Sequence, residues 1–524
     1  MHDVEIVLGL LVAVDVLATV ARRIGVPYPI LLVLGGLVLG FVPGLPRITL
    51  NPDIVFLVFV PPLVYSAAYF TSWRDFVANR RPILLLAIGL VLATMVIVAA
   101  AAEGALPGFT WPAAFVLGAV VSDTDTTAAV AIAERLRIPR QVVTILEGES
   151  LINDAVGLTA FRLAVVATVT GVFSPWSVGA DFALATVGAL AIGLAVGWLT
   201  TWGSAHLDDR LVAITAGLLA PYAAYLPADR LGASGILAVV VAGLYYGHRA
   251  PRVNPPDTRL QARAVWDLLI FVENGLLFIL VGLELRPIWD ALAVRSATRV
   301  LGDAALVCAV VILARVVWVF ASVALARRGR HAAVDAPAPN WRSGAIVAWA
   351  GMRGGDTLAA ALGVPLLTDR GLPFPARSLI VFLAFAVIFV TLVGQGLTLP
   401  PLIRWLGVRG GEAEAAEEVL ARRAATGAAL ARLDALATAG EVPPGMLASL
   451  RKFYRHKATL LPGERAGADE AAAQHVALHQ RVQRAIVQAE RQAVLGLRDE
   501  GAIGDDVLHR IERELDLEEV RDEI

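Results

Sequence analysis

The sequence predicts an all-α polytopic membrane protein of about 13 transmembrane helices, followed by a cytoplasmic helical tail. Two observations support this fold class. The chain has 524 residues, of which 57% are hydrophobic and only 17% are charged, with a mean hydropathy of +0.69. A soluble protein of this size does not need so much apolar surface. In addition, the apolar residues gather into segments of spanning length.

The apolar segments are expected to span the membrane in turn. The first has Asp3 and Glu5 before it and no basic stretch, so it is expected to be a transmembrane helix and not a cleaved signal peptide. A polar loop is expected at 250–263. The expected spans are 4–21, 27–41, 54–70, 82–102, 111–136, a sixth that begins at Pro139, 178–199, 211–225, 231–246, 265–285, 300–326, 343–367 and 379–402.

Basic residues are concentrated in the loops that follow odd-numbered spans. By the positive-inside rule, this bias predicts an N-terminus outside the cell membrane and a cytoplasmic C-terminus. The odd number of spans agrees with that orientation. The basic residues concerned include Arg22, Arg23, Arg74, Arg80, Arg81, Arg135, Arg137, Arg140, Arg249, Arg252, Arg327 and Arg328.

The composition changes after about Gly407, so two domains are expected: a transmembrane domain over 1–408 and a helical domain over 409–524. The tail is rich in Ala, Glu, Arg and Leu, which favours solvated helices. It is expected to help assembly or to regulate transport. The 44 basic and 46 acidic residues balance, which predicts no nucleic-acid partner, and the single Cys308 excludes a disulfide framework.

Polar residues are unusually dense in the fifth and sixth spans. A charge at the bilayer centre costs roughly 2.5–3.5 kcal/mol. Several such residues in two consecutive spans therefore indicate an ion site. They are Asp123, Asp125, Glu147, Glu149, Asn153, Asp154 and Arg162.

The sixth span places oxygen ligands on one face. Asp154 lies about 22 Å along a helix that starts near Pro139, which is close to mid-bilayer. Ser150 shares its face at i,i+4, and Glu147 lies one turn further back. Carboxylate and hydroxyl oxygens are hard ligands that suit a small cation.

The fifth span contains a poor stretch of helix, 122–127, in which Ser, Thr and Asp side chains compete for the backbone. An unwound patch at membrane depth is tolerated where it lines a cavity. Unwinding there would free backbone carbonyls, including that of Thr124, as cation ligands.

Thr124-Asp125 followed by the sequence EGESLIND at 147–154 resembles the signature of the sodium/proton antiporters. The Asn153-Asp154 pair is similar to that of the electroneutral branch of the monovalent cation:proton antiporters, bacterial type. The resemblance covers about 1–409. It implies inverted repeats, two crossing broken helices and assembly as a homodimer. It also implies a core bundle of spans 5, 6, 12 and 13 beside a dimerisation scaffold built largely from early spans.

The resemblance implies electroneutral exchange of Na+ (or Li+) for H+ at a cell membrane, without cofactor and without enzyme activity. Na+ and H+ would compete for Asp154, with Ser150, Glu149 and the Thr124 carbonyl completing the Na+ site. Asp125 and Asn153 would link the unwound helix to the ion-binding helix.

The segment 350–355, which contains Arg353 between glycines, resembles a family segment and predicts a second broken helix. Glu149 is the expected partner of Arg353, with Glu147 second. Asp356 replaces a small or apolar residue of the family; it could pair with Arg353, face a cavity or alter the ion site. Asp123 replaces a family proline, and we expect it to have a structural role.

Three alternatives stay open. K+/H+ exchange would use the same mechanism, because oxygen ligands alone do not fix cation size. A channel or sensor could share the fold, although a site that saturates with one ion favours exchange. An intramembrane enzyme would need a nucleophile or metal constellation, and the spans hold no His or Cys cluster. Other ionisable residues, such as Arg162 and Arg315, are expected in structural ion pairs or at the membrane edge.

Overall fold

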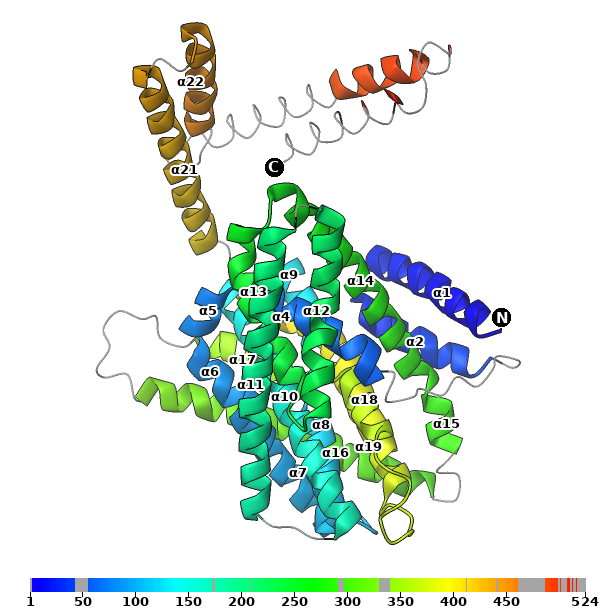
Figure 1. Ribbon diagram of the computed structural model, residues 1–524. Coiled ribbons are helices and arrows are strands. Elements are labelled where there is room, and N and C mark those ends of the chain that lie inside the picture. The colour runs from blue at the N-terminus through cyan, green and yellow to red at the C-terminus, as the bar shows by residue number, and fades with distance from the viewer. Residues whose placement is uncertain are drawn as a thin grey trace. The chain divides into compact units, whose positions relative to one another are not determined.

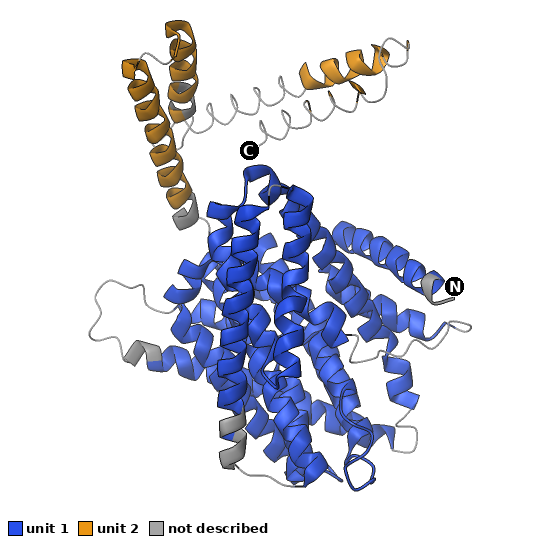
Figure 2. Cartoon of the chain, in the orientation of Figure 1, with its two compact units in different colours: residues 1–410 blue, residues 411–524 orange. Residues whose placement is uncertain are grey.

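The computed structural model describes residues 2–42, 55–171, 175–207, 209–290, 296–328, 340–410, 412–439 and 442–459, and short stretches between 486 and 515. The chain divides into two compact units, residues 1–410 and 411–524 (Figure 2).

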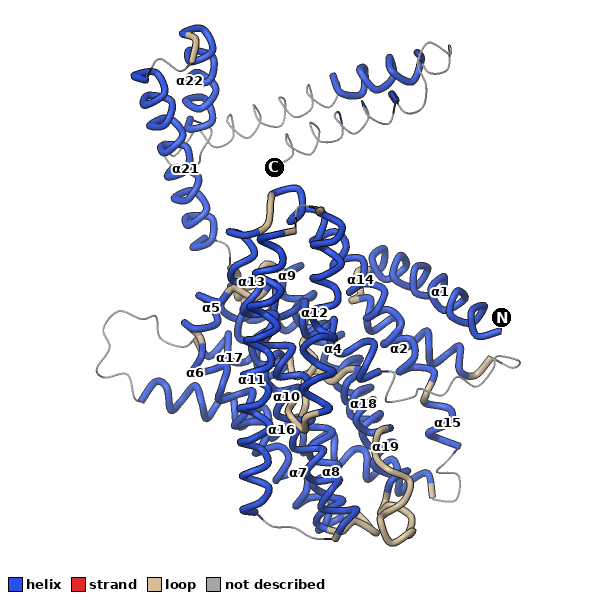
Figure 3. Tube along the Cα trace, viewed as in Figure 1, coloured by secondary structure: helices blue, strands red, loops and turns tan. Residues whose placement is uncertain are grey.

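Unit 1 is a bundle of helices, and its described residues form no strand (Figures 1 and 3). Its main helices are α1 (His2–Ile24), α2 (Tyr28–Gly40), α4 (Val60–Phe70), α5 (Trp73–Ala78), α6 (Arg80–Leu84), α7 (Val91–Ala105), α8 (Trp111–Ser122), α9 (Thr127–Arg135), α10 (Arg140–Thr170), α11 (Pro175–His206), α12 (Arg210–Arg230), α13 (Gly235–Val253), α14 (Pro256–Leu283), α15 (Leu285–Asp290), α16 (Ala297–Arg328), α17 (Trp341–Trp349), α18 (Gly355–Leu362), α19 (Arg377–Phe389) and α20 (Gly396–Leu406). Three π-helical segments, η1 (Val55–Phe59), η2 (Leu85–Leu90) and η3 (Val390–Gln395), continue directly into α4, α7 and α20.

Eight described helices are long and apolar enough to cross a membrane, and 28–40 and 55–70 are shorter apolar helices. Large apolar side chains point outward from the bundle, as Leu184 and Val317 do at 74% and 65% exposure. Such surfaces suit contact with lipid. The chain is therefore a multi-pass membrane protein, as predicted. A helix or a pair of half-helices lies at each of the 13 expected spans, and the number that cross stays a prediction.

The prediction of a polar loop at 250–263 is wrong, because helices occupy most of this range. α13 continues to Val253 and α14 begins at Pro256, so only two residues separate these helices. The reason is local: Pro256 stands at the first position of α14, where a missing N–H costs nothing and the fixed φ angle favours a helix.

Two helices are broken, as predicted. Residues 123–126 separate α8 from α9, and residues 350–354 separate α17 from α18. The two breaks face each other: a Cβ atom added at Gly354 would overlap the Asp125 carboxylate. The Arg353 Nε also donates to the Val121 carbonyl at 3.2 Å. Glycine at 354 is required because this close approach leaves no room for a side chain.

Around the breaks, α10 packs against α8, α13, η2 and α17. Apolar side chains such as Leu117, Leu146 and Ile346 are almost fully buried there. The bundle therefore surrounds the polar residues of α10 with protein and not with lipid.

Unit 2 contains α21 (Glu412–Ala439) and α22 (Pro444–Thr459), which pack as a hairpin with Leu433 and Leu447 buried. An exposed ion pair joins Arg451 of α22 to Asp434 of α21 at 2.5 Å.

The α2–α14 contact provides a test of the packing. A Cβ at Gly282 would clash with the Val33 carbonyl and the backbone of Gly36. We expect Gly282→Ala to lower the free energy of unfolding by about 1–3 kcal/mol, because two backbones would have to separate. Gly302→Ala is the matched control: it lies within α16 with open space around it, and alanine there should be neutral or stabilising. Thermal unfolding of the purified proteins in detergent would show the difference. Equal midpoints would contradict this account of the interface.

Candidate ion-binding site

The polar residues of α10 lie beside the break between α8 and α9. α10 is continuous over 31 residues, so it holds its side chains at fixed positions. Glu149, Asn153 and Asp154 are all buried on it, with exposures of 1%, 0% and 6%. The non-helical residues 123–126 face them with two buried threonines and two aspartates.

One hydrogen-bonded network joins the break to α10. The Asn153 amide donates to the Thr124 carbonyl at 3.0 Å and to the Thr124 hydroxyl at 2.5 Å. The Thr124 hydroxyl in turn donates to Glu149 Oε1 at 2.9 Å. The Thr124 carbonyl is free of helical bonding because the chain is extended there, and a buried carbonyl without a partner is costly. Asn153 therefore stabilises the break.

A buried ion pair completes this network. The Arg315 guanidinium on α16 binds Glu149 with two bonds, of 2.5 Å and 2.9 Å, and both side chains are 1% exposed. Arg315 also donates twice to the Val347 carbonyl, at 3.0 Å and 3.2 Å. Val347 lies in the last turn of α17, where helix carbonyls lack helical partners. Arg315 thus ties α10, α16 and the second broken helix together.

The predicted partner of Arg353 is wrong: Glu149 pairs with Arg315 instead. The Arg353 guanidinium donates to two backbone carbonyls, those of Val121 and Gly351. Its backbone N–H donates to the Thr391 hydroxyl at 3.1 Å. The physical reason is that both helix breaks expose carbonyl groups, and a five-donor guanidinium can satisfy several at once.

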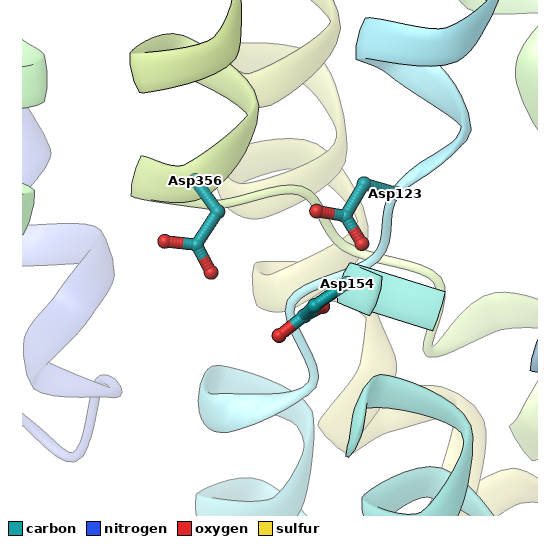
Figure 4. A group of neighbouring side chains, drawn as sticks. All are labelled: Asp123, Asp154 and Asp356. Atoms are coloured by element: carbon teal, nitrogen blue, oxygen red, sulfur yellow. The ribbon is translucent and has the colours of Figure 1, made fainter. Parts of the chain in front are cut away.

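A second cluster gathers three carboxylates. Asp123, Asp154 and Asp356 each place an oxygen within 4.8 Å of the others. They come from three elements: the extended break, α10 and the first turn of α18. Figure 4 shows the three side chains as neighbours, each from a different segment of the chain. Asp356 therefore belongs to the same cluster as Asp154.

Three further residues predicted for the site, Asp125, Ser150 and Glu147, belong to neither the ion-pair network nor the carboxylate cluster. Asp125 accepts a hydrogen bond from the Thr127 N–H at 2.9 Å, at the start of α9. Ser150 and Glu147 lie on α10 and are half-buried. The predicted ligand set of Asp154, Ser150, Thr124 and Glu149 is therefore divided. Glu149 and Thr124 belong to the network of the ion pair, while Asp154 belongs to the carboxylate cluster.

Two features of the site could not be predicted from the sequence: the acidic partner of Arg315, and the clustering of Asp123 and Asp356 with Asp154. Arg315 was expected in a structural ion pair or at the membrane edge, but its partner was not foreseen. The signal was present, because a single arginine deep in the apolar run 300–326 requires a buried acid. Asp123 and Asp356 lie far apart in the sequence, and no spacing within one helix relates them to Asp154.

Two broken helices whose breaks meet beside buried carboxylates are typical of secondary transporters of cations. The family described as the transmembrane sodium/hydrogen exchanger matches residues 9–405. The chain therefore belongs to the sodium/hydrogen exchanger family, whose members are transporters and not enzymes, as predicted.

Relatives agree with this assignment. An uncharacterised Na+/H+ exchanger of Mycobacterium tuberculosis is 37% identical over 98% of this chain and 95% of its own length. A sodium, potassium, lithium and rubidium/H+ antiporter of Bacillus pumilus is 34% identical over 72% of this chain and 58% of its own. The solved sodium proton antiporter MjNhaP1 of Methanocaldococcus jannaschii superimposes with a TM-score of 0.63 at 20% identity, over 78% of this chain and 99% of that one. It supports the fold.

The buried ion pair predicts a large loss of stability on removing one partner. We expect Glu149→Gln to lower the free energy of unfolding by about 3–5 kcal/mol, because the guanidinium of Arg315 would stay buried without its carboxylate. Thermal unfolding in detergent would measure this change. The double variant Glu149→Leu/Arg315→Met should recover part of the loss.

Arg162→Met is the matched control for this prediction. It breaks the ion pair with Asp229, whose side chains are 52% and 41% exposed. Such a pair contributes about 1 kcal/mol or less. Similar losses for Glu149→Gln and Arg162→Met would contradict a special structural role for the buried pair.

Proposed function

We propose that the protein exchanges Na+ or Li+ for H+ across the membrane, with Asp154 as the group that carries either ion. The family supports cation/proton antiport in general. The position of Asp154 carries the finer proposal: it is a buried carboxylate beside a helix break. The carboxylates of Asp123 and Asp356 lie beside it, while the guanidinium of Arg315 is engaged by Glu149. A cation or a proton is the natural way to neutralise it.

Competition at one carboxylate explains the coupling. Asp154 can hold a cation or a proton but not both, so each half-cycle moves one positive charge on the same group. With one proton exchanged for one monovalent cation, no net charge crosses, and membrane voltage does not drive transport. Ser150 and Asn153 are close along α10 and are proposed to assist at the cation site.

K+/H+ exchange is the second candidate, and a specific observation favours it. The Bacillus relatives are named as antiporters of sodium, potassium, lithium and rubidium. Hard oxygen ligands accept all of these ions, and selectivity depends on the size and stiffness of the cavity.

We further propose the setting in which this exchange takes place. The basic loops after odd-numbered spans put the N-terminus outside and the C-terminus in the cytoplasm. The core formed by α8–α9, α10, α17–α18 and α19–α20 would move against the early spans, which would join two copies in a homodimer. The two breaks support such a division, because Gly354 of one break lies directly against Asp125 of the other. The tail, 409–524, is proposed to assist assembly or to regulate transport.

Asp154→Asn tests the proposed carrier. The amide has the same shape but cannot take up a proton or neutralise a cation, so we expect Na+-driven proton flux to fall to the level of empty liposomes. The measurement is pH change inside proteoliposomes after addition of Na+, Li+ or K+, with the membrane voltage clamped. Wild-type flux should be unchanged by the clamp.

Asp209→Asn is the matched control, since it also replaces one carboxylate by an amide. Asp209 is an exposed cap of α12, where asparagine caps as well as aspartate. Its flux should equal that of the wild type. Full flux in Asp154→Asn would reject Asp154 as the carrier, and a preference for K+ would keep the mechanism and change the cation.

A further inference from the structure

We propose that the cluster of Asp123, Asp154 and Asp356 binds a divalent cation, best matched by Ca²⁺, which competes with the monovalent cation. The inference rests on the proposed function in one respect, namely that Asp154 is shared by both ions. It goes further by assigning a second class of ligand to the site and by giving Asp123 and Asp356 direct contact with it.

The spacing of the carboxylates fits Ca²⁺. Each residue offers one oxygen, and these oxygens lie within 4.8 Å of one another. Ca²⁺ binds oxygen ligands at about 2.3–2.6 Å in flexible geometry, so three carboxylates this close to one another can all bind it. Mg²⁺ usually keeps several waters and binds one or two carboxylates, so a cluster of three favours Ca²⁺.

The charge of the cluster also fits a divalent ion. Three ionised carboxylates carry three negative charges at one point in the bundle. Arg353 lies nearby but gives its guanidinium hydrogen bonds to backbone carbonyls, and it adds one positive charge to the region. Asp125 of the same break adds one negative charge. The formal sum is then −3 − 1 + 1 = −3, of which a divalent cation balances two charges and a monovalent cation only one.

Unpartnered oxygens supply an independent sign of a ligand. Among the residues that the structure describes, Oδ1 of Asp123 and Oδ1 of Asp356 have no hydrogen-bond partner. Asp123 is 6% exposed, so water outside the bundle does not solvate its carboxylate freely. Figure 4 shows the Asp123 carboxylate turned toward the other two. Buried carboxylate oxygens left open in this way usually bind an ion or an ordered water.

The rest of the surroundings explains why the oxygens stay open. Glu149 is held by Arg315, and the side-chain N–H of Asn153 donates to Thr124, while Oδ1 of Asn153 also has no hydrogen-bond partner. Asp123 lies on extended backbone and Asp356 in the first turn of a half-helix. The helix N-terminus near Asp356 favours negative charge there, which keeps its carboxylate available as a ligand.

The test uses the full chain in proteoliposomes and adds Ca²⁺ alone as the probe. We expect Ca²⁺ to inhibit Na+-driven proton flux competitively, raising the Na+ concentration needed for half-maximal flux. The measured quantity is the ratio of the Ca²⁺ inhibition constant to the half-saturating Na+ concentration. In Asp123→Asn and Asp356→Asn this ratio should rise by about tenfold or more over the wild type, because one of three Ca²⁺ ligands is lost. Equilibrium binding of radioactive Ca²⁺ to the purified protein gives a second readout that does not need transport.

Asp209→Asn serves again as the control, with unchanged inhibition by Ca²⁺, and thermal unfolding shows whether each variant is folded. If the wild type shows Na+-driven flux but neither binds Ca²⁺ nor is inhibited by it at millimolar concentration, this proposal is wrong and the proposed function stands. If Ca²⁺ binds with equal affinity to both aspartate variants, the ion lies elsewhere and the proposal is also wrong. Absence of Na+, Li+ and K+ flux in the wild type would instead reject the proposed function, and the binding measurement would still decide the Ca²⁺ site.

Discussion

The buried ion pair between Arg315 and Glu149 is the interaction on which the centre of the bundle depends. Charges in a low-dielectric interior are tolerated only when their hydrogen-bonding capacity is filled. Here the guanidinium fills it with two carboxylate oxygens and the Val347 carbonyl, and the carboxylate adds the Thr124 hydroxyl. One pair therefore connects α10, α16 and both broken helices beside the candidate ion site.

The two helix breaks leave backbone carbonyls unpaired, and these polar side chains donate hydrogen bonds to them. A helix that stops inside a bundle leaves carbonyls without helical partners. Arg353 takes the carbonyl of Val121, Arg315 that of Val347, and Asn153 that of Thr124. Each break is thus closed by a side chain from another element. Opening the site for an ion without exposing these carbonyls would require the connected elements to move as a unit, which agrees with a rigid core in a transporter.

Much of this could be predicted from the sequence, and the reasons are local. The unwinding at 123–126 follows from adjacent Ser, Thr and Asp residues, and the break at 350–354 follows from its glycines. Asp154 and Glu149 could be placed on one helix from spacing alone. The partner of Arg353 and the meeting of Asp123, Asp154 and Asp356 could not. They depend on how three distant segments pack, and periodicity within a segment carries no information about that.

The site separates two kinds of carboxylate that the sequence presents side by side. Glu149 is saturated by a guanidinium and a hydroxyl, so binding a cation there would first have to displace a charged partner. Asp154, five residues further along α10, is grouped with carboxylates instead. Under the proposed exchange, Glu149 would hold the scaffold at constant charge while Asp154 changes its occupant. A transporter needs this separation, because a group that both supports the fold and releases the ion would loosen the bundle in every cycle.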